Sequence, residues 1–191
     1  WCRPIKSILA TLDGKKLNFS YAGIQSNFFT YGNYHYTKQK IKCNEANHYK
    51  KIMKKNNVLI NSSDRSKKIR RKLESFCKRK KLKSEFQDSL VKRIANSVEY
   101  INVFFASFDK KYFELPDFLL ETIITEKQDN FCFKDTKGNL SNFFSFVSNK
   151  KKSNQKNLIE GNLNVLKARF SDANFFIKED LKIKLSNRLE K

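Results

Sequence analysis

The chain has 191 residues, with 40 Lys and Arg against 19 Asp and Glu, so its formal net charge is +21. This length suits one domain or two small ones, and 39% hydrophobic with 14% aromatic residues excludes an intrinsically disordered chain. No run of 18 apolar residues occurs, which excludes a membrane-spanning helix. The charge favours a polyanionic partner, with nucleic acid as the first candidate and an anionic membrane surface as the second.

Alternating apolar residues at the start of the chain predict β structure. Residues 5–21 are expected to form a hairpin, because Asp13-Gly14 suits a two-residue turn that needs positive φ at both positions. An aromatic-rich segment follows at 27–36. After a lysine-rich stretch, residues 58–60 are expected to form a short strand.

The apolar spacing at 64–81 predicts an amphipathic helix. Its apolar stripe consists of Ile69, Leu73, Phe76 and Cys77. Its remaining surface carries Lys67, Lys68, Arg70, Arg71, Lys72, Lys78, Arg79 and Lys80. A second helix is expected to begin at Ser84, whose hydroxyl would form a capping box with Gln87.

In the second half of the chain, the apolar run 103–108 predicts a buried strand, and Pro116 is expected to open a helix that extends to about 126. Residues 130–133 and 143–147 are expected to pair around a turn that uses Gly138. A helix over 163–176 with Asn162 as its cap follows a basic loop, and a last helix is expected from 179 to the end.

This order of strands and helices, without regular βαβ alternation, predicts an α+β fold with mixed or antiparallel sheet elements and packed amphipathic helices. We expect one region over 1–191, with room for a sub-boundary near 61–64. The chain begins with Trp1 and shows no signal peptide, so we expect an internal piece of a longer protein.

Signals for catalysis are weak in the sequence, and its cysteines and histidines lack the spacing of metal ligands. The glycines are isolated, which excludes a glycine-rich phosphate loop, and no serine lies in a nucleophile elbow. The four cysteines form no Cys-x-x-Cys pair, and only His35 and His48 are available beside them. We therefore expect reduced, mostly buried thiols, no metal site and no catalytic residue.

Two features suit nucleic acid. The cations of the 64–81 helix can lie on phosphates, and the aromatic segment can stack unpaired bases. Two alternatives stay open: the helix face is merely solvated, and the aromatic cluster is core. Lys outnumbers Arg 32 to 8, and Asn occurs 20 times, which is typical of an A+T-rich genome, so codon usage accounts for part of the charge.

Short motifs in a fixed order resemble one known family. Residues 1–5, Trp-Cys-Arg-Pro-Ile, are similar to an aromatic-x-Arg-Pro-(Val/Ile) motif, and residues 23–26 to Gly-Ile-x-Ser. Residues 108–116 are similar to Phe-x-x-x-(Phe/Tyr)-Leu-x-(Leu/Val)-Pro. The most specific match is 161–176, which resembles Gly-Asn-Glu-x-Val-Leu-x-Ala-Arg-Leu-x-Asp-Ala-x-Phe-Phe. All four belong to the bacterial glycyl-tRNA synthetase beta subunit.

The resemblance implies that the chain is an internal part of a beta subunit that supports tRNA-Gly binding and subunit assembly. In this family a separate alpha subunit activates glycine, so ATP with Mg is expected there and no cofactor is expected in this segment. The partners implied are the alpha subunit and tRNA-Gly, in a cytoplasmic heterotetramer with no membrane contact.

One departure changes where tRNA contact is expected. The family's Arg-Gly-His-Arg falls at 31–34, where this chain has Tyr-Gly-Asn-Tyr. Stacking by Tyr31 and Tyr34 is the chemistry that remains, and phosphate contact moves to the 64–81 helix. The expected tRNA-binding cations are Arg3, Lys67, Arg70, Arg71, Arg79, Lys167 and Arg169.

Asp172 is assigned a structural role together with the cap Asn162. It stands three residues after Arg169, so the two are expected to pair, unless Arg169 contacts RNA or the partner subunit. Two other functions stay open for the whole chain. One is a structural module for subunit contact without tRNA binding, and the other is an independent basic nucleic-acid-binding domain.

Overall fold

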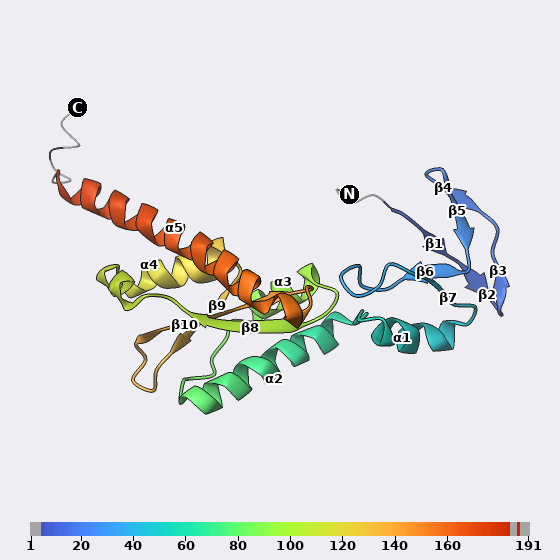
Figure 1. The fold of residues 1–191 in the computed structure, drawn as a ribbon, viewed down its shortest axis with the longest axis horizontal. Coiled ribbons are helices and arrows are strands. Elements are labelled where there is room, and N and C mark those ends of the chain that lie inside the picture. Colours follow the sequence, from blue (N-terminus) through green and yellow to red (C-terminus); the bar gives the residue numbers. More distant parts are fainter. Residues whose placement is uncertain (1–4, 184–186, 188–191) are drawn as a thin grey trace.

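The protein consists of small β-sheets followed by a larger unit in which helices cover both faces of a sheet (Figure 1). The computed structural model describes residues 5–183 and residue 187. Strands and helices occur together, and most strand pairs are antiparallel, so the predicted α+β class is confirmed. The small sheets end before residue 61, and the larger unit begins at residue 62. Whether these parts fold as separate domains stays a prediction.

The N-terminal part contains seven short strands and one helix among its described residues. One three-stranded sheet has the strand order β1 (Ile8–Leu9), β5 (Ile24–Asn27), β4 (Ser20–Tyr21). Two strand pairs accompany it: β2 (Thr11–Leu12) with β3 (Lys15–Lys16), and β6 (Phe29–Tyr31) with β7 (Lys40–Lys42). Helix α1 (Ala46–Lys55) follows.

The predicted hairpin is confirmed around its turn and wrong beyond it. Asp13 and Gly14 have φ values of 49° and 76°, as a two-residue turn between β2 and β3 requires. The pairing stops at Lys16, because a second tight turn at Ala22-Gly23 pairs β4 with β5 instead. Strand β1 runs parallel to β5.

The expected strand at 58–60 is wrong. This segment is extended, but the backbone N–H of Leu59 donates to the carbonyl of Glu99 at 2.8 Å, outside any sheet. The guanidinium of Arg65 donates to the carbonyls of Leu59 and Ile60. The segment therefore connects the two parts through isolated hydrogen bonds and makes no strand pairing.

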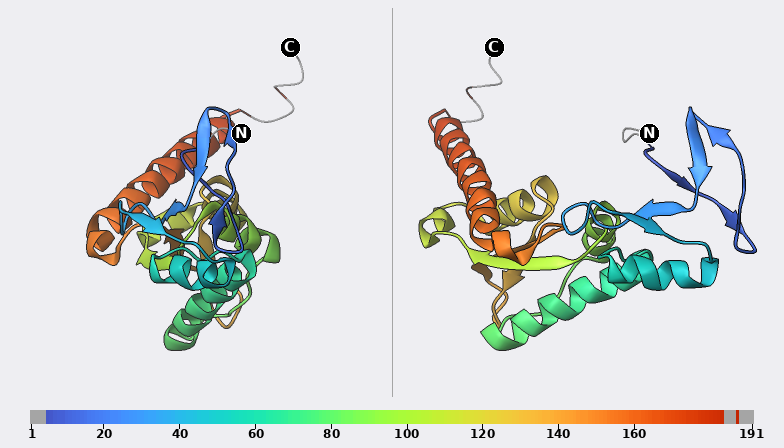
Figure 2. Two further views of the ribbon diagram at one scale, coloured as in Figure 1. Left: turned by 90° about the vertical axis from the view of Figure 1, so that its right-hand side faces the viewer. Right: turned by 45° about the vertical axis from the view of Figure 1, so that its right-hand side comes forward.

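The larger unit is built on an antiparallel sheet in the order β8 (Asn102–Ser107), β10 (Leu140–Ser148), β9 (Phe131–Lys134). Helices α2 (Ser62–Lys80) and α3 (Asp88–Ser97) cover one face, and α4 (Asp117–Thr122) and α5 (Gln155–Leu181) cover the other (Figures 1 and 2). The strands predicted at 103–108, 130–133 and 143–147 are confirmed, and Gly138 in the connecting turn has φ 98°.

Side chains of β8 alternate between two cores. Phe105 belongs with the α2 and α3 cluster, and Phe104 with the α4 and α5 cluster. Because both faces of the sheet are buried, the strand is a continuous apolar run without polar alternation. Aromatic rings fill both cores: Phe76 stacks on Phe105 at 4.1 Å between centroids, and Phe104 on Phe146 at 5.2 Å.

The helix at 64–81 is confirmed, and its whole predicted stripe is buried. The helix expected to open at Pro116 is also confirmed; it starts at Asp117 and continues into a π-helical turn over Ile123–Lys127. The prediction of a capping box at Ser84 is wrong, because α3 begins only at Asp88 and the side chain of Gln87 makes no capping hydrogen bond.

The cap predicted for Asn162 is also wrong, since one helix runs from Gln155 to Leu181. Asn162 lies inside this helix, and its amide donates to the carbonyl of Leu158 at 2.9 Å. Leu158 and Ile159 pack against the core, which extends the helix by two turns before the expected start. The helix expected from 179 to the end is the last part of α5, and its remainder lies largely outside the described residues.

Candidate nucleic-acid interface

The basic face of α2 is directed toward solvent, because the opposite stripe is buried against the sheet and α3. Lys67, Arg71 and Arg79 of the predicted contact set are exposed there. Lys72, Lys78 and Lys80 are exposed on the same helix. The geometry thus keeps a row of cations accessible to a polyanion.

Arg70 differs from the other predicted cations of α2. Its guanidinium forms an ion pair with the carboxylate of Asp88 at the start of α3. This contact joins two helices on one side of the sheet. Reversing the charge at Arg70 would place two carboxylates together and disturb helix packing, so Arg71 is the better position for testing RNA contact.

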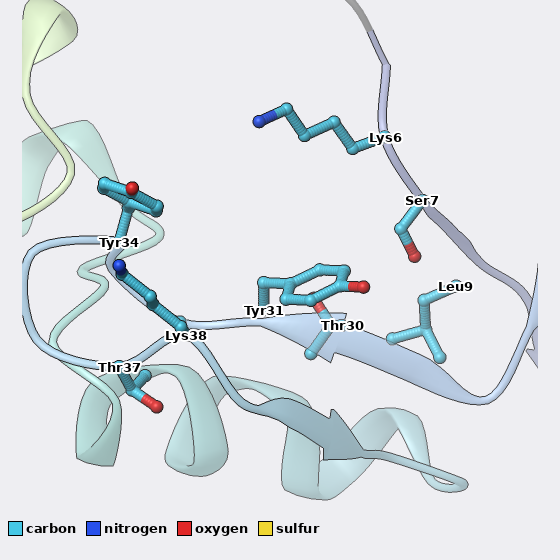
Figure 3. A pocket seen from close by; sticks show the side chains of 9 residues that line it. Lys6, Ser7, Leu9, Thr30, Tyr31, Tyr34, Thr37 and Lys38 are labelled. Atoms are coloured by element: carbon cyan, nitrogen blue, oxygen red, sulfur yellow. The ribbon is translucent and has the colours of Figure 1, made fainter.

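A second basic and aromatic surface lies on the N-terminal part, where Tyr31 and Tyr34 line an open cavity of about 510 Å³ (Figure 3). Tyr34 is 66% exposed and Tyr31 is 39% exposed. The ammonium group of Lys38 lies 5.3 Å from the centroid of the Tyr34 ring, and Lys6 reaches into the same space from the N-terminal segment. Cations and accessible π faces therefore meet in one place.

The turn between the two tyrosines explains their exposure. Asn33 is buried; its N–H donates to the Asn56 carbonyl at 3.0 Å, and its side-chain oxygen accepts from the N–H of His35. A Cβ at Gly32 would lie 2.7 Å from the Asn56 carbonyl oxygen, so this position has no room for a side chain. With Gly32 and Asn33 held against α1, the flanking Tyr31 and Tyr34 face solvent.

Two lysines of this cavity, Lys6 and Lys38, are not among the contact residues predicted from the sequence. Lys38 follows Tyr34 by four residues, so the interleaving of cations with aromatics was the available signal. No sequence signal places Lys6 there, because it reaches the cavity only through the parallel pairing of β1 with β5 and the contact of β1 with β6.

The predicted residues of α5 lie on another side of the molecule. Lys167 and Arg169 are exposed, but α5 covers the sheet face opposite to α2. Asp172 is exposed too, and within the described residues no ion pair joins it to Arg169. Contact of Arg169 with RNA or a partner stays a prediction. Arg3 lies outside the described residues.

The described cysteines are unpaired, as the sequence predicts. Cys43 and Cys77 are buried and Cys132 is half-buried. Desolvation raises the pKa of Cys132 to about 12 and that of Cys77 to about 11, with smaller contributions from Glu121 and Glu74 respectively. Both are neutral thiols at neutral pH and unsuited to nucleophilic attack.

Between residues 5 and 183, no three His, Cys, Asp or Glu side chains are grouped so as to hold a metal ion. Of the helices in the same part of the chain, none has the combination of length and apolar character that a membrane crossing demands.

The fold and these surfaces define a strongly basic α+β segment with exposed lysines beside exposed tyrosines. Comparison with known proteins gives its family. All of residues 1–191 match the family described as glycyl-tRNA synthetase beta subunit, so the chain belongs to that family.

Several relatives in this family are similar over nearly all of the chain. The glycine–tRNA ligase beta subunit of Thermodesulfovibrio yellowstonii is 33% identical over 188 residues, which are 98% of this chain and 28% of the relative. The beta subunit of Aquifex aeolicus is 36% identical over 180 residues, which are 94% of this chain and 27% of the relative. The beta subunit of Rickettsia felis is 31% identical over 193 aligned residues, which cover 100% of this chain and 29% of the relative. The chain spans less than a third of the length of these relatives.

Proposed function

We propose that this chain is a tRNA-binding segment of a glycine–tRNA ligase. The observation that supports the proposal most is the cavity lined by Lys6, Tyr31, Tyr34 and Lys38. An unpaired base stacks on Tyr34 or Tyr31, and the ammonium groups of Lys6 and Lys38 contact the adjoining phosphates. The family name supports tRNA as the nucleic acid, because its members are subunits of a ligase for tRNA.

The α2 face adds a second electrostatic contact to this proposal. Its exposed lysines and arginines release counterions when they meet RNA phosphates, which makes binding depend steeply on salt. The tyrosines of the cavity supply stacking, which depends little on salt, whereas Lys6 and Lys38 add phosphate contacts that depend on salt like those of α2. Salt titration therefore separates stacking from phosphate contact.

The test measures tRNA-Gly binding by the wild-type chain and by Tyr34→Ala and Lys38→Gln variants at several salt concentrations. Loss of one stacked base is expected to cost about 1 to 3 kcal/mol, so Tyr34→Ala raises Kd by about five-fold to 150-fold. Tyr21→Ala is the matched control, because Tyr21 is 65% exposed and lines no part of this cavity. Equal Kd values for the Tyr34 and Tyr21 variants would overturn the stacking role, and a flat salt response would overturn the electrostatic one.

A second proposed role is assembly within the longer subunit. Among the described residues before 61, Cys43 and Met53 are the only buried apolar side chains, whereas Leu12, Leu17 and Phe19 are exposed. The relatives are far longer than this chain, so we assign the remaining beta-subunit polypeptide as the cover of these side chains. Leu12→Ser with Phe19→Ser is expected to lower Tm in the full-length subunit and leave Tm of the 191-residue chain unchanged.

The control for assembly is Phe118→Ser on α4, an aromatic residue of the larger unit that is 72% exposed, against 45% for Phe19. It is expected to change Tm little in either setting. If the full-length subunit loses no more stability than the isolated chain from the Leu12 and Phe19 substitutions, the assembly role is wrong.

In the whole ligase we propose that this segment acts with an alpha subunit in a cytoplasmic heterotetramer. Glycine activation, with ATP and Mg, is assigned to that alpha subunit, and this segment contributes no catalytic residue. Addition of purified alpha subunit to the full-length beta subunit, with and without the Tyr34→Ala substitution, tests this division. Glycine-dependent pyrophosphate exchange should be unaffected by the substitution, and transfer to tRNA should fall.

A further inference from the structure

A second cavity lies where the N-terminal part meets the larger unit, and it has a volume of about 570 Å³. Four separate segments line it: the β6–β7 loop, α2, the start of β8 and the turn after β10. The side chains that matter here are Tyr36, Lys68, Lys72, Tyr100, Asn102 and Lys151.

Three ammonium groups gather at this cavity, and two are positioned by aromatic rings. Lys68 lies 4.0 Å from the centroid of the Tyr100 ring, and Lys151 lies 5.4 Å from that of Tyr36. The two rings contact each other edge-to-face, with centroids 5.6 Å apart. These ammonium groups give the cavity positive charge to offer to a ligand.

The residues that line this cavity include no Asp or Glu, and no ion pair joins Lys72 or Lys151 to a described carboxylate. The Tyr36 hydroxyl accepts a hydrogen bond from the amide of Asn102, so its own proton is available for an acceptor. Ammonium and hydroxyl donors around one space suit an anion rich in oxygen.

We propose that this cavity binds a phosphodiester group of an RNA strand, separately from the tyrosine cavity at residues 31 and 34. Lys72 and Lys151 contact the phosphate oxygens, and Tyr36 donates a further hydrogen bond. The inference rests on the proposed function, since the RNA is the tRNA bound there. An RNA strand explains why Lys72 and Lys151, from distant segments of a chain with charge +21, converge on a cavity whose lining holds no carboxylate.

The site also joins the two parts of the molecule. Tyr36 belongs to the N-terminal part, and the other side chains belong to the larger unit. A phosphate held by both is bound best when the parts are docked as in this structure. RNA binding is therefore expected to slow hydrogen exchange in the β6–β7 loop.

The experiment compares the wild-type chain with a Lys72→Gln and Lys151→Gln double variant. A Lys110→Gln and Lys127→Gln variant is the matched control, with the same change in charge at exposed lysines that lie outside this cavity, outside the tyrosine cavity and outside α2. The slope of log Kd for tRNA-Gly against log salt is expected to fall by about 0.7 to 0.9 for each cavity lysine removed. The control pair is expected to keep a slope close to that of the wild type.

A second measurement locates the ligand directly. Bound tRNA is expected to protect Lys72 and Lys151 from acylation, read by mass spectrometry, while inorganic phosphate gives no such protection. Equal protection by inorganic phosphate would overturn the assignment to RNA in favour of a small-anion site. An unchanged slope in the double variant, with normal wild-type binding, would overturn this cavity alone. Failure of the wild-type chain to bind tRNA at low salt would overturn the proposed function and this inference with it.

Discussion

The amide of Asn102 donates a hydrogen bond to the hydroxyl of Tyr36 at 2.7 Å, which ties β8 to a loop 66 residues earlier in the chain. Asn102 is only 6% exposed, and the same amide donates to the carbonyl of Lys150 at 2.8 Å. Edge-to-face contact of Tyr36 with Tyr100 accompanies the bond. One buried side chain thus organises the junction between the two parts.

Asn102→Ala is expected to loosen this junction. The substitution removes both donors and leaves the Lys150 carbonyl without this partner, at a cost of about 1 to 3 kcal/mol. Hydrogen exchange should become faster in residues 32–39, and urea unfolding should report the loss of stability. Tyr36→Phe keeps the ring contact and should cost less. Unchanged exchange in the 32–39 loop of the Asn102 variant would contradict the role given to this residue.

Arg65 is expected to be a structural arginine despite its place on the basic helix. Its guanidinium donates to the carbonyls of Ala95 at 2.6 Å and Ile60 at 2.8 Å, and also to that of Leu59. Arg65→Ala should lower the free energy of unfolding by about 2 to 3 kcal/mol, because charged donors to these carbonyls are lost. Arg71→Ala, on an exposed position of the same helix, should change it by less than about 0.5 kcal/mol. Similar losses in chemical denaturation for both variants would refute the assignment.

Two glycines are expected to respond in opposite directions to alanine. At Gly32 a Cβ would lie 2.7 Å from the carbonyl oxygen of Asn56, so Gly32→Ala should destabilise the protein by about 1 to 3 kcal/mol. Nothing lies within 4 Å of the corresponding position at Gly161, inside α5, so Gly161→Ala should stabilise it by about 1 kcal/mol. Thermal unfolding of the two variants checks both signs at once.

Cys132 is expected to make stability fall at alkaline pH. Burial raises its pKa in the folded protein from 9.0 to about 12, so the folded state retains a proton that the unfolded state releases. The contribution of the neutral thiol to the free energy of unfolding is complete below about pH 9 and is lost as pH rises toward 12. Cys132→Ala should reduce the loss of stability at alkaline pH. Because the same lysines titrate in wild type and variant, the difference between the two proteins reports the thiol. Parallel stability curves for wild type and variant between pH 8 and 11 would show that the thiol has no such effect.

Local periodicity predicted the elements that pack on one sheet. The stripe through Ile69 and Leu73 identified α2, and the apolar run 103–108 identified β8, since burial against a sheet selects the same residues that set the period. Errors occurred where packing or pairing overrides a local signal. Helix α5 starts before Asn162 because Leu158 packs on the core, and the hairpin stops at Lys16 because β5 offers β4 another partner.

The sequence alone determined the charge, the family resemblance and the α+β class, and it made Tyr31 and Tyr34 candidates for stacking, because these depend on composition and on short motifs. Tertiary structure alone decided that Arg70 is held by Asp88, and that Tyr36, Lys72 and Lys151 surround one cavity. The reason is physical: the convergence of like charges is set by the docking of distant segments, which no local pattern records.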